Sequence, residues 1–273
     1  RCRPYTRSTG ERSANVCSPA IGTASRPSRL TEYLRRAFRS DAVSFSSMTL
    51  IVSNIRTLGE VMETTRPLIV AHRGFSGRFD DNSPEAFKAA FELPIHGVEC
   101  DVRLTRDGEL VVAHDPVSSG DGLMPFSDLL AMFANYPDHH LYVEIKHNRF
   151  NARVQERTLQ ELRRHGLDKS DRIHIISFSR NAVRYFRKRA PLLDTYFLLG
   201  PRTWWLPAAP VGLGPSIVRL NAKPALIGRL GVRTYTWTVN TPRQMLWCAE
   251  HGVDVLATDL PDLALETLAS PRE

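Results

Sequence analysis

The chain has 273 residues, of which 42% are hydrophobic and 24% charged, so it can bury a full core and lacks the composition of a disordered protein. Its net charge of +7 is concentrated at the start, because residues 1–63 carry ten arginines and five acids and leave about +2 for the rest. This weak charge on the body argues against a nucleic-acid or membrane surface, and we expect no nucleic-acid partner.

Residues 1–62 are rich in Arg, Ser, Thr and Pro, and we expect a disordered N-terminal extension there. Three readings stay open: an organelle-targeting segment, a flexible basic arm, or translated sequence upstream of a true start at Met48 or Met62. The apolar run near 43–55 is too short and too polar to cross a bilayer, and no signal-peptide pattern precedes it. No stable membrane insertion and a cytoplasmic location are therefore expected. The four cysteines have no CxxC spacing and are predicted to be reduced, buried thiols.

From Pro67 onward, strand-like and helix-like segments alternate. The predicted strands are 68–72, 97–104, 141–146, 172–178, 194–199, 216–221, 233–240 and 254–258. The predicted helices are 83–93, 126–136, 152–165, 180–189, 224–230 and 242–251. Gly97, Gly166 and Gly252 follow helical patterns, and we expect each to act as a C-terminal cap.

Eight strands alternating with helices over residues 63–273 predict a small α/β domain, a TIM-type (β/α)8 barrel. Several strands are continuous Val/Ile/Leu runs, which are typical of strands covered on both faces. An open doubly wound sheet is the alternative. The first strand-to-helix turn argues against it, because this turn lacks the GxGxxG spacing of a dinucleotide site, and the chain has no GxxxxGK[ST] motif.

Ionisable residues collect where the first three predicted strands end, the position of catalytic groups in such barrels. They are His72 and Arg73 on the first strand, Glu99 and Asp101 on the second, and Glu144 and Lys146 on the third. The last two pairs are spaced i, i+2, so both members of each pair point to one face, into the barrel. Three crowded carboxylates with no Cys or His cluster suit Ca²⁺ or Mg²⁺. A salt-bridge network that closes the barrel is the alternative.

The segment RLTRDGELVVAHDP, 103–116, predicts a hairpin with an Asp-Gly turn. This hairpin would return His114 to the same mouth as His72. Two imidazoles can serve as acid and base on opposite sides of a phosphorus atom, while a cation and basic side chains neutralise phosphate oxygens. The set therefore suits phosphodiester hydrolysis.

Six motifs run in order through almost the whole body. They are AHRG at 71–74, DNSPEAF at 81–87, GVECDVRLTRDGELVVAHDP at 97–116, VEIKH at 143–147, YTWTVNTP at 235–242 and GVDVLATDLPDL at 252–263. In these segments the sequence resembles the glycerophosphodiester phosphodiesterase family. One motif alone would be weak, but the ordered set is highly specific.

The resemblance implies a TIM-type barrel that cleaves a small-molecule glycerophosphodiester to an alcohol and glycerol 3-phosphate, with a bound divalent cation. It implies that the glycerol 2-hydroxyl of the substrate attacks first in this chemistry. The roles implied are an acid/base pair of His72 and His114, phosphate-side charges on Arg73 and Lys146, and metal ligands Glu99, Asp101 and Glu144.

The chain departs from the family pattern at Asp81-Asn82-Ser83, where the family has E-N-T. The shorter Asp81 is expected to contact the site or to hold His72 or Arg73 in place. Its alternative role is that of an acid at a helix N-terminus, because Ser83 is well placed as the N-cap before a proline.

Asn82, Trp237 and Asn240 are expected beside Asp81 as substrate-binding residues, with a purely packing role as the alternative for Trp237. A related barrel enzyme that acts on lysophospholipids, as a hydrolase or a cyclising lyase, is the nearest rival function. A non-catalytic barrel that binds phosphodiesters is a rival of another class, although a binding module needs no acid/base pair.

Overall fold

The structure is a computed structural model that describes residues 66–146, 153–201, 203 and 212–269. These residues all belong to the second of the two units into which the chain divides, Met62–Glu273. The predicted N-terminal extension 1–62 and its boundary with the barrel lie outside the described residues and stay predictions.

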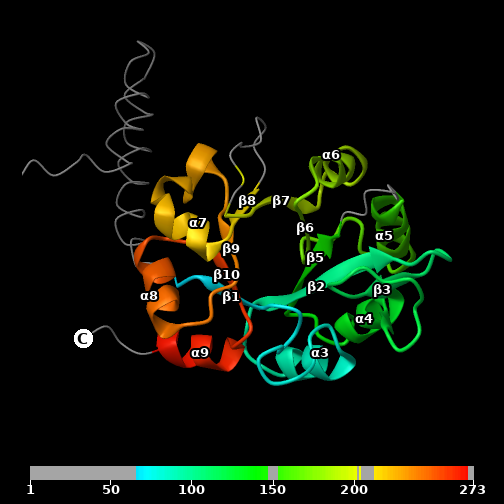
Figure 1. Ribbon diagram of the computed structural model, residues 1–273, viewed down its shortest axis with the longest axis horizontal. Coiled ribbons are helices and arrows are strands. Elements are labelled where there is room, and N and C mark those ends of the chain that lie inside the picture. The colour runs from blue at the N-terminus through cyan, green and yellow to red at the C-terminus, as the bar shows by residue number, and fades with distance from the viewer. Residues whose placement is uncertain (1–65, 147–152, 202, 204–211, 270–273) are drawn as a thin grey trace, which may run out of the picture. The chain divides into compact units, whose positions relative to one another are not determined.

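Within the described part of the chain, eight parallel strands form a nearly closed barrel (Figure 1). They are β1 (Leu68–Ala71), β2 (Gly97–Leu104), β5 (His140–Ile145), β6 (Ile173–Ser177), β7 (Asp194–Leu199), β8 (Gly212–Pro215), β9 (Tyr235–Thr236) and β10 (Val255–Thr258). The strand order is β8-β7-β6-β5-β2-β1-β10-β9, and isolated parallel bridges from Leu213 to Thr234 and from Ser216 to Trp237 join the two ends. The predicted (β/α)8 barrel is confirmed.

Helices lie around the outside of the strands (Figure 1). They are α3 (Pro84–Phe91), α4 (Phe126–Phe133), α5 (Val154–Arg164), α6 (Arg180–Arg189), α7 (Ile217–Ala222), α8 (Pro242–Glu250) and α9 (Pro261–Ala269). Ser83, Ser179, Ser216 and Thr241 each accept a backbone N–H as N-cap, so a hydroxyl residue marks where the chain turns from strand to helix. The end of β2 and the short strand β3 (Leu110–Val112) pair antiparallel and form the predicted hairpin, and β4 (Met124–Pro125) pairs with the other edge of β3.

The prediction of a strand at 216–221 is wrong, because this segment forms helix α7 with Ser216 as its N-cap. The barrel strand is the preceding GLGP segment, β8, which has almost none of the apolar side chains that identify a strand in sequence. Its glycines are required by close packing. A Cβ on Gly212 would lie 2.3 Å from the Tyr196 ring, and one on Gly214 would lie 2.5 Å from Leu198 Cδ2.

Other segments also differ from the sequence prediction. The predicted helix 224–230 consists of two short 3-10 turns, Pro224–Leu226 and Arg229–Gly231, and α9 was not predicted. Gly97 is not a helix cap but the first residue of β2, where an added Cβ would lie 2.2 Å from the carbonyl oxygen of His140. The pattern misled because a glycine needed for close strand packing resembles a glycine that ends a helix.

Buried side chains form separate groups on the two sides of the barrel wall. Val98, Cys100 and Val102 of β2 belong to the large core between the strands and the helices, on the face opposite the predicted inward side of Glu99 and Asp101. A smaller cluster inside the barrel includes Val70, Tyr142, Ile176, Tyr196, Leu198, Tyr235, Val255 and Ala257. Cys100 and Cys248 are buried and free, which confirms the predicted thiols among the described residues.

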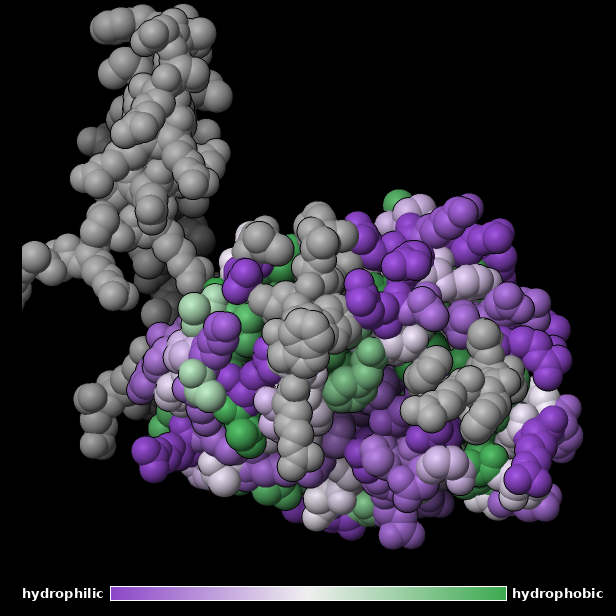
Figure 2. Space-filling view, turned by 45° about the horizontal axis from the view of Figure 1, so that its top comes forward, coloured by the Kyte–Doolittle hydropathy of each residue, from purple (hydrophilic) through white to green (hydrophobic). Residues whose placement is uncertain are grey.

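The face drawn in Figure 2 is mostly hydrophilic, with apolar side chains scattered over it. Phe178, directly after β6, is one of the exposed aromatic residues, with 44% of its surface accessible. Among the helices that the structure describes, none has the length and apolar character needed to span a bilayer.

Three histidines lie together at the amino-terminal end of the barrel. His96 precedes β2, His140 begins β5, and His174 lies in β6 with 1% of its surface exposed. His140 Nδ1 is 2.8 Å from His174 Nε2, and the rings of His96 and His140 stack with centroids 4.0 Å apart. Burial, reinforced by repulsion among the imidazoles, lowers the pKa of His96 to about 3 and that of His140 to about 4.

We expect the contribution of His96 and His140 to the stability of the folded state to be lost as the pH falls below the ordinary histidine pKa of 6.5. The lowered pKa values of His96 and His140 mean that the unfolded chain binds more protons in this range, so the stabilisation is complete above 6.5 and is lost as the pH falls toward about 4. Urea unfolding between about pH 7 and about pH 5, with a chelator present, measures the effect. His140→Gln should lose less stability than the parent chain between these two pH values, while His251→Gln at the exposed end of α8 should match the parent. Equal changes in both variants would contradict the prediction.

Candidate active site

A cavity of about 250 Å³ opens at the carboxyl ends of the barrel strands. Its polar lining consists of His72, Arg73, Glu99, His114, Glu144 and Lys146. Its apolar and neutral lining consists of Ile176, Phe178, Leu198, Tyr235, Trp237 and Thr238. Seven of the residues predicted from sequence therefore meet at one cavity, where a single small molecule could contact them together.

Three buried carboxylates lie together at this end of the barrel, and two of them, Glu99 and Glu144, line the cavity. Glu99 and Asp101 lie on β2, and Glu144 lies on the neighbouring β5, directly opposite Asp101 in the register. One oxygen atom from each lies within 4.8 Å of the others, and the three residues are at most 7% exposed. The i, i+2 spacing placed both carboxylates of β2 on the inner face, as the sequence predicted.

Lys146 balances part of this negative charge. Its Nζ lies 2.8 Å from Asp101 Oδ1 and 3.0 Å from Glu144 Oε2. Burial raises the pKa of Glu144 to about 7 against the opposing effect of Lys146, and burial together with repulsion from the two other carboxylates raises the pKa of Glu99. Burial also disfavours the charge on Asp101, but Lys146 and Arg73 hold the pKa of Asp101 below its usual range.

The carboxylate group fits a hard divalent cation. Glu99 Oε1 is buried and has no hydrogen-bond partner, which leaves an oxygen lone pair available inside the barrel. Repulsion that raises the pKa of Glu99 and Glu144 would be relieved by a positive ion among three oxygen donors. The residues that could hold a cation are therefore Glu99, Asp101 and Glu144. Lys146 forms salt bridges with two of these ligands, Asp101 and Glu144.

His72 is held by an aspartate at the end of β10. Its Nδ1 lies 2.7 Å from Asp259 Oδ1, which also accepts a hydrogen bond from Ser76 Oγ at 3.0 Å. Asn240 Nδ2 donates to the other oxygen of Asp259 at 2.5 Å. Burial opposes ionisation of Asp259, but these hydrogen bonds lower its pKa to about 2. An ionised Asp259 makes Nδ1 the protonated nitrogen of His72, so the Nε2 lone pair is free, 4.0 Å from Glu99 Oε2.

His114 reaches the cavity from the hairpin after β2. Its Nδ1 lies 2.9 Å from Asp115 Oδ1, and 40% of its side chain is exposed. Arg103 Nε donates to the backbone carbonyl oxygen of His114 at 2.8 Å, and Arg103 Nη2 contacts the same oxygen. The predicted hairpin therefore brings the second histidine to the cavity, in a more open setting than that of His72.

Arg73 adopts a left-handed backbone conformation, with φ of 56°, which is unusual for a residue with a side chain. Its backbone N–H donates to Glu99 Oε2 at 3.0 Å, while its Nε lies 3.1 Å from Asp101 Oδ2. Its Nη1 donates to Asp81 Oδ2 at 2.6 Å. Strained backbone of this kind persists where surrounding contacts fix it, and here these contacts aim the arginine at the carboxylates.

Asp81, Asn82 and Asn240 were predicted to bind substrate, but they are not among the cavity-lining residues. Asp81 holds Arg73, which is one of the two roles expected for it. Asn82 is 5% exposed, and its amide exchanges two hydrogen bonds with Asp101, at 2.9 and 3.2 Å. Asn240 binds Asp259. The three therefore act on residues of the site in this structure. The two amides satisfy oxygens of Asp101 and Asp259 that would otherwise lack partners, and Asp81 pairs with Arg73.

Trp237 lines the cavity as predicted. Its Nε1–H donates to the Gly214 carbonyl oxygen at 2.8 Å, and its ring lies edge-on to that of Phe178, with centroids 5.4 Å apart. These two rings form an apolar wall opposite the charged residues.

Sequence reasoning missed Asp259 and Phe178 as site residues. Asp259 lies in the motif GVDVLATDLPDL and directly follows a predicted strand, so the rule that catalytic groups sit at strand ends could have identified it. Phe178 follows β6 in the same way, but a lone apolar residue at a strand end carries no chemical signal.

Comparisons with known proteins agree along the barrel. The model of the Glycerophosphoryl diester phosphodiesterase family matches residues 72–120 and 118–263. A Mycobacterium tuberculosis relative named "Probable glycerophosphodiester phosphodiesterase 1" is 33% identical over 248 residues, 71% of this chain and 90% of the relative. A glycerophosphodiester phosphodiesterase of Caldanaerobacter subterraneus is 27% identical, over 72% of this chain and 96% of its own. The crystal structure of a glycerophosphodiester phosphodiesterase from Parabacteroides distasonis is 26% identical, with a TM-score of 0.65, and covers 75% of this chain and 97% of its own.

Proposed function

Because the chain belongs to the glycerophosphoryl diester phosphodiesterase family, we propose that it hydrolyses glycerophosphodiesters to an alcohol and glycerol 3-phosphate in the cavity between His72 and His114. The observation that carries this proposal is the meeting of two imidazoles, two basic side chains and two carboxylates at one small cavity, with a third carboxylate, Asp101, grouped with them. A phosphodiester needs charge neutralisation at its oxygens and proton transfer on both sides of phosphorus, and this set supplies both.

His72 is assigned the role of general base. Asp259 holds its Nδ1–H, so its Nε2 can accept the proton of an attacking hydroxyl, whether from the substrate glycerol or from water. His114 is assigned the role of general acid, because its more exposed imidazole lies where a leaving alcohol can depart to solvent. Arg73 and Lys146 bind the phosphate oxygens in this scheme, and Asp81 and Asn82 act by positioning Arg73 and Asp101.

A divalent cation, Ca²⁺ or Mg²⁺, is proposed to bind to Glu99, Asp101 and Glu144. Such a cation supplies neutralisation of charge on phosphate oxygens. The uncompensated Glu99 oxygen and the raised pKa of Glu144 support this assignment.

A product assay tests the proposal. The full chain is incubated with glycerophosphocholine, glycerophosphoethanolamine and glycerophosphoinositol, and glycerol 3-phosphate and the free alcohol are quantified. Both products should appear in equal amounts. If these substrates bind without any product, the non-catalytic barrel is supported instead.

A lysophospholipid substrate is the second candidate, favoured by one observation: the apolar wall of Phe178 and Trp237 borders the cavity, and Phe178 is 44% exposed. An acyl chain could lie on that wall. Lysophosphatidylcholine belongs in the same panel. A higher kcat/KM for it than for glycerophosphocholine would favour this candidate, and a cyclic phosphate product would indicate a lyase.

The cytoplasmic location expected from sequence stays a prediction.

Asp259→Asn should lower kcat by about 10²–10⁴-fold with little change in KM, because an amide oxygen can no longer hold the His72 tautomer through an ionic hydrogen bond. The pH profile of kcat should shift as well, which a loss of packing alone would not cause. Asp262→Asn is the matched control, since Asp262 pairs only with the exposed Arg78 among the ion pairs of the described residues. An unchanged pH profile in Asp259→Asn would argue against this positioning role.

A further inference from the structure

The three histidines at the amino-terminal end of the barrel are separate from the candidate active site. His140, Tyr142 and Glu144 are every second residue of β5, so their side chains all point to the inside of the barrel. Roughly 13 Å of strand separates His140 from Glu144. Tyr142 is fully buried between them and stacks on His174, with ring centroids 4.3 Å apart. Nothing in the proposed hydrolysis uses this histidine cluster.

We propose that His96, His140 and His174 bind a divalent transition-metal ion such as Zn²⁺, at a second site distinct from the carboxylates. One ring nitrogen from each residue lies within 4.8 Å of the others. Imidazole nitrogen suits zinc, copper and nickel, whereas the all-oxygen group at the other end suits calcium and magnesium. The two ends of the barrel therefore select different classes of ion.

One unsatisfied nitrogen in the cluster supports this proposal independently of its spacing. His96 Nε2 is buried and has no hydrogen-bond partner, so its lone pair is available to an ion. His174 Nδ1 lies 3.6 Å from Asp194 Oδ2, the arrangement in which a carboxylate orients a metal-binding histidine through its far nitrogen. Asp194 therefore favours a proton on Nδ1 and leaves the Nε2 lone pair of His174 directed toward His140.

Neutral imidazoles are the form that binds a metal. Burial and mutual repulsion lower the pKa of His96 to about 3 and of His140 to about 4, so both are neutral at neutral pH and no proton must be displaced to free them. Burying three polar imidazole rings costs free energy. Nitrogen–metal bonds to a bound ion would offset this cost.

Metal binding requires a small rearrangement. His140 Nδ1 and His174 Nε2 now share one proton across 2.8 Å. When both nitrogens bind the ion, this proton moves to Nε2 of His140, which keeps the ring neutral and releases no proton. The two nitrogens separate to roughly 3.3 Å, the spacing that tetrahedral zinc–nitrogen bonds need. The His96 ring turns out of its stack with His140 so that its nitrogen points at the ion.

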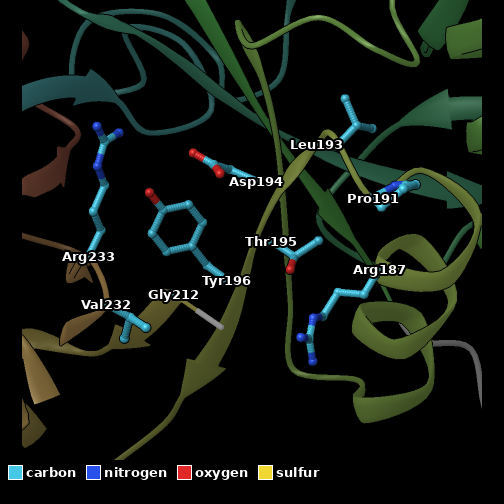
Figure 3. Close-up of a pocket in the computed structure, with 9 residues that line it drawn as sticks. All are labelled: Arg187, Pro191, Leu193, Asp194, Thr195, Tyr196, Gly212, Val232 and Arg233. Atoms are coloured by element: carbon cyan, nitrogen blue, oxygen red, sulfur yellow. The ribbon is translucent and has the colours of Figure 1, made fainter. Parts of the chain in front are cut away.

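A cavity of about 570 Å³ at the same end of the barrel gives solvent a route to the Asp194 side of the cluster. Figure 3 shows Asp194, Tyr196 and Arg233 directed toward a common space. Arg233 places a positive charge at this opening, and the Asp194 carboxylate offsets it. Asp194 therefore reduces the repulsion that Arg233 would exert on a cation bound to the histidines.

Calorimetric titration of Zn²⁺ into the full chain, without an affinity tag and with excess Mg²⁺ to occupy the carboxylates, tests the proposal. One Zn²⁺ should bind per chain, and Co²⁺ in the same site should show the strong visible absorption of a tetrahedral ion. His140→Gln should weaken Zn²⁺ binding by more than about 100-fold, and Asp194→Asn by about 10–100-fold. The second variant changes an exposed carboxylate, so it keeps the test valid if the first fails to fold.

Two controls distinguish this site from others. Glu144→Gln and His251→Gln should both leave Zn²⁺ affinity unchanged, because neither residue belongs to the cluster. The proposal is overturned if no stoichiometric Zn²⁺ binds, if His140→Gln and Asp194→Asn bind as tightly as the parent chain, or if binding is lost in Glu144→Gln.

Discussion

His72→Ala and His114→Ala should each reduce turnover of glycerophosphodiesters by about 10²–10⁴-fold, because each removes one proton-transfer group from the reaction. The two residues line one cavity, and each has its own aspartate partner, Asp259 for His72 and Asp115 for His114. Steady-state kinetics measures kcat and KM, and circular dichroism checks that the fold is retained.

The two variants should differ in their substrate dependence. If His114 donates the proton to the leaving alcohol, His114→Ala should recover activity on a substrate whose leaving group needs no proton, such as a p-nitrophenyl ester. His72→Ala should not recover, because the attacking hydroxyl still lacks a base. His165→Ala on the surface of α5 is the control. Near-normal kcat in either active-site variant would rule out the two-histidine mechanism.

Removal of divalent cations by a chelator should abolish activity, and Ca²⁺ or Mg²⁺ should restore it. Glu99, Asp101 and Glu144 each place one carboxylate oxygen within 4.8 Å of the others. Glu99 Oε1 is buried and has no hydrogen-bond partner. Activity assays after chelation and dialysis, followed by titration of each cation, measure the dependence and the preferred ion.

Glu99→Gln should weaken cation binding by at least about 10–100-fold while it keeps the shape of the site. This variant separates the two readings of the carboxylate group. If the carboxylates form only a structural salt-bridge network, Glu99→Gln should lower stability, and activity should not depend on cation in either the parent or the variant. Full activity in metal-free protein would refute the cation site. Thermal unfolding of the same variant, with and without cation, supplies the second readout.

Much of the site could be predicted because its signal is local. The alternation of Glu99 and Asp101 with apolar residues on β2 fixes which side chains face inward, and the barrel rule fixes which strand ends carry chemistry. His72 and His114 follow from the same reasoning, since each ends or returns to one of those strands. The two-residue period of a strand and the position at a strand end are enough to identify these residues. Both can be read from a short stretch of sequence.

The remaining features depend on contacts between segments far apart in sequence. The partnership of Asp259 with His72 spans 187 positions and becomes visible only when β10 pairs with β1. Strand β8 was missed because a glycine-rich segment reads as a turn until Tyr196 and Leu198 are seen to fill the space above it. The histidine cluster was also missed, because its members lie at or near the starts of three different strands and share no motif.

Strand β8 also limits how this active site could change over time. Trp237, which forms the apolar wall, is anchored to the carbonyl oxygen of Gly214, and an added Cβ on Gly214 would lie 2.5 Å from Leu198, which lines the same cavity. Any larger residue at Gly214 would therefore press on the wall that lines the cavity. Changes in substrate preference would therefore have to come from residues at the ends of neighbouring elements, such as Phe178 after β6. Substitutions in β8 itself would be tolerated poorly.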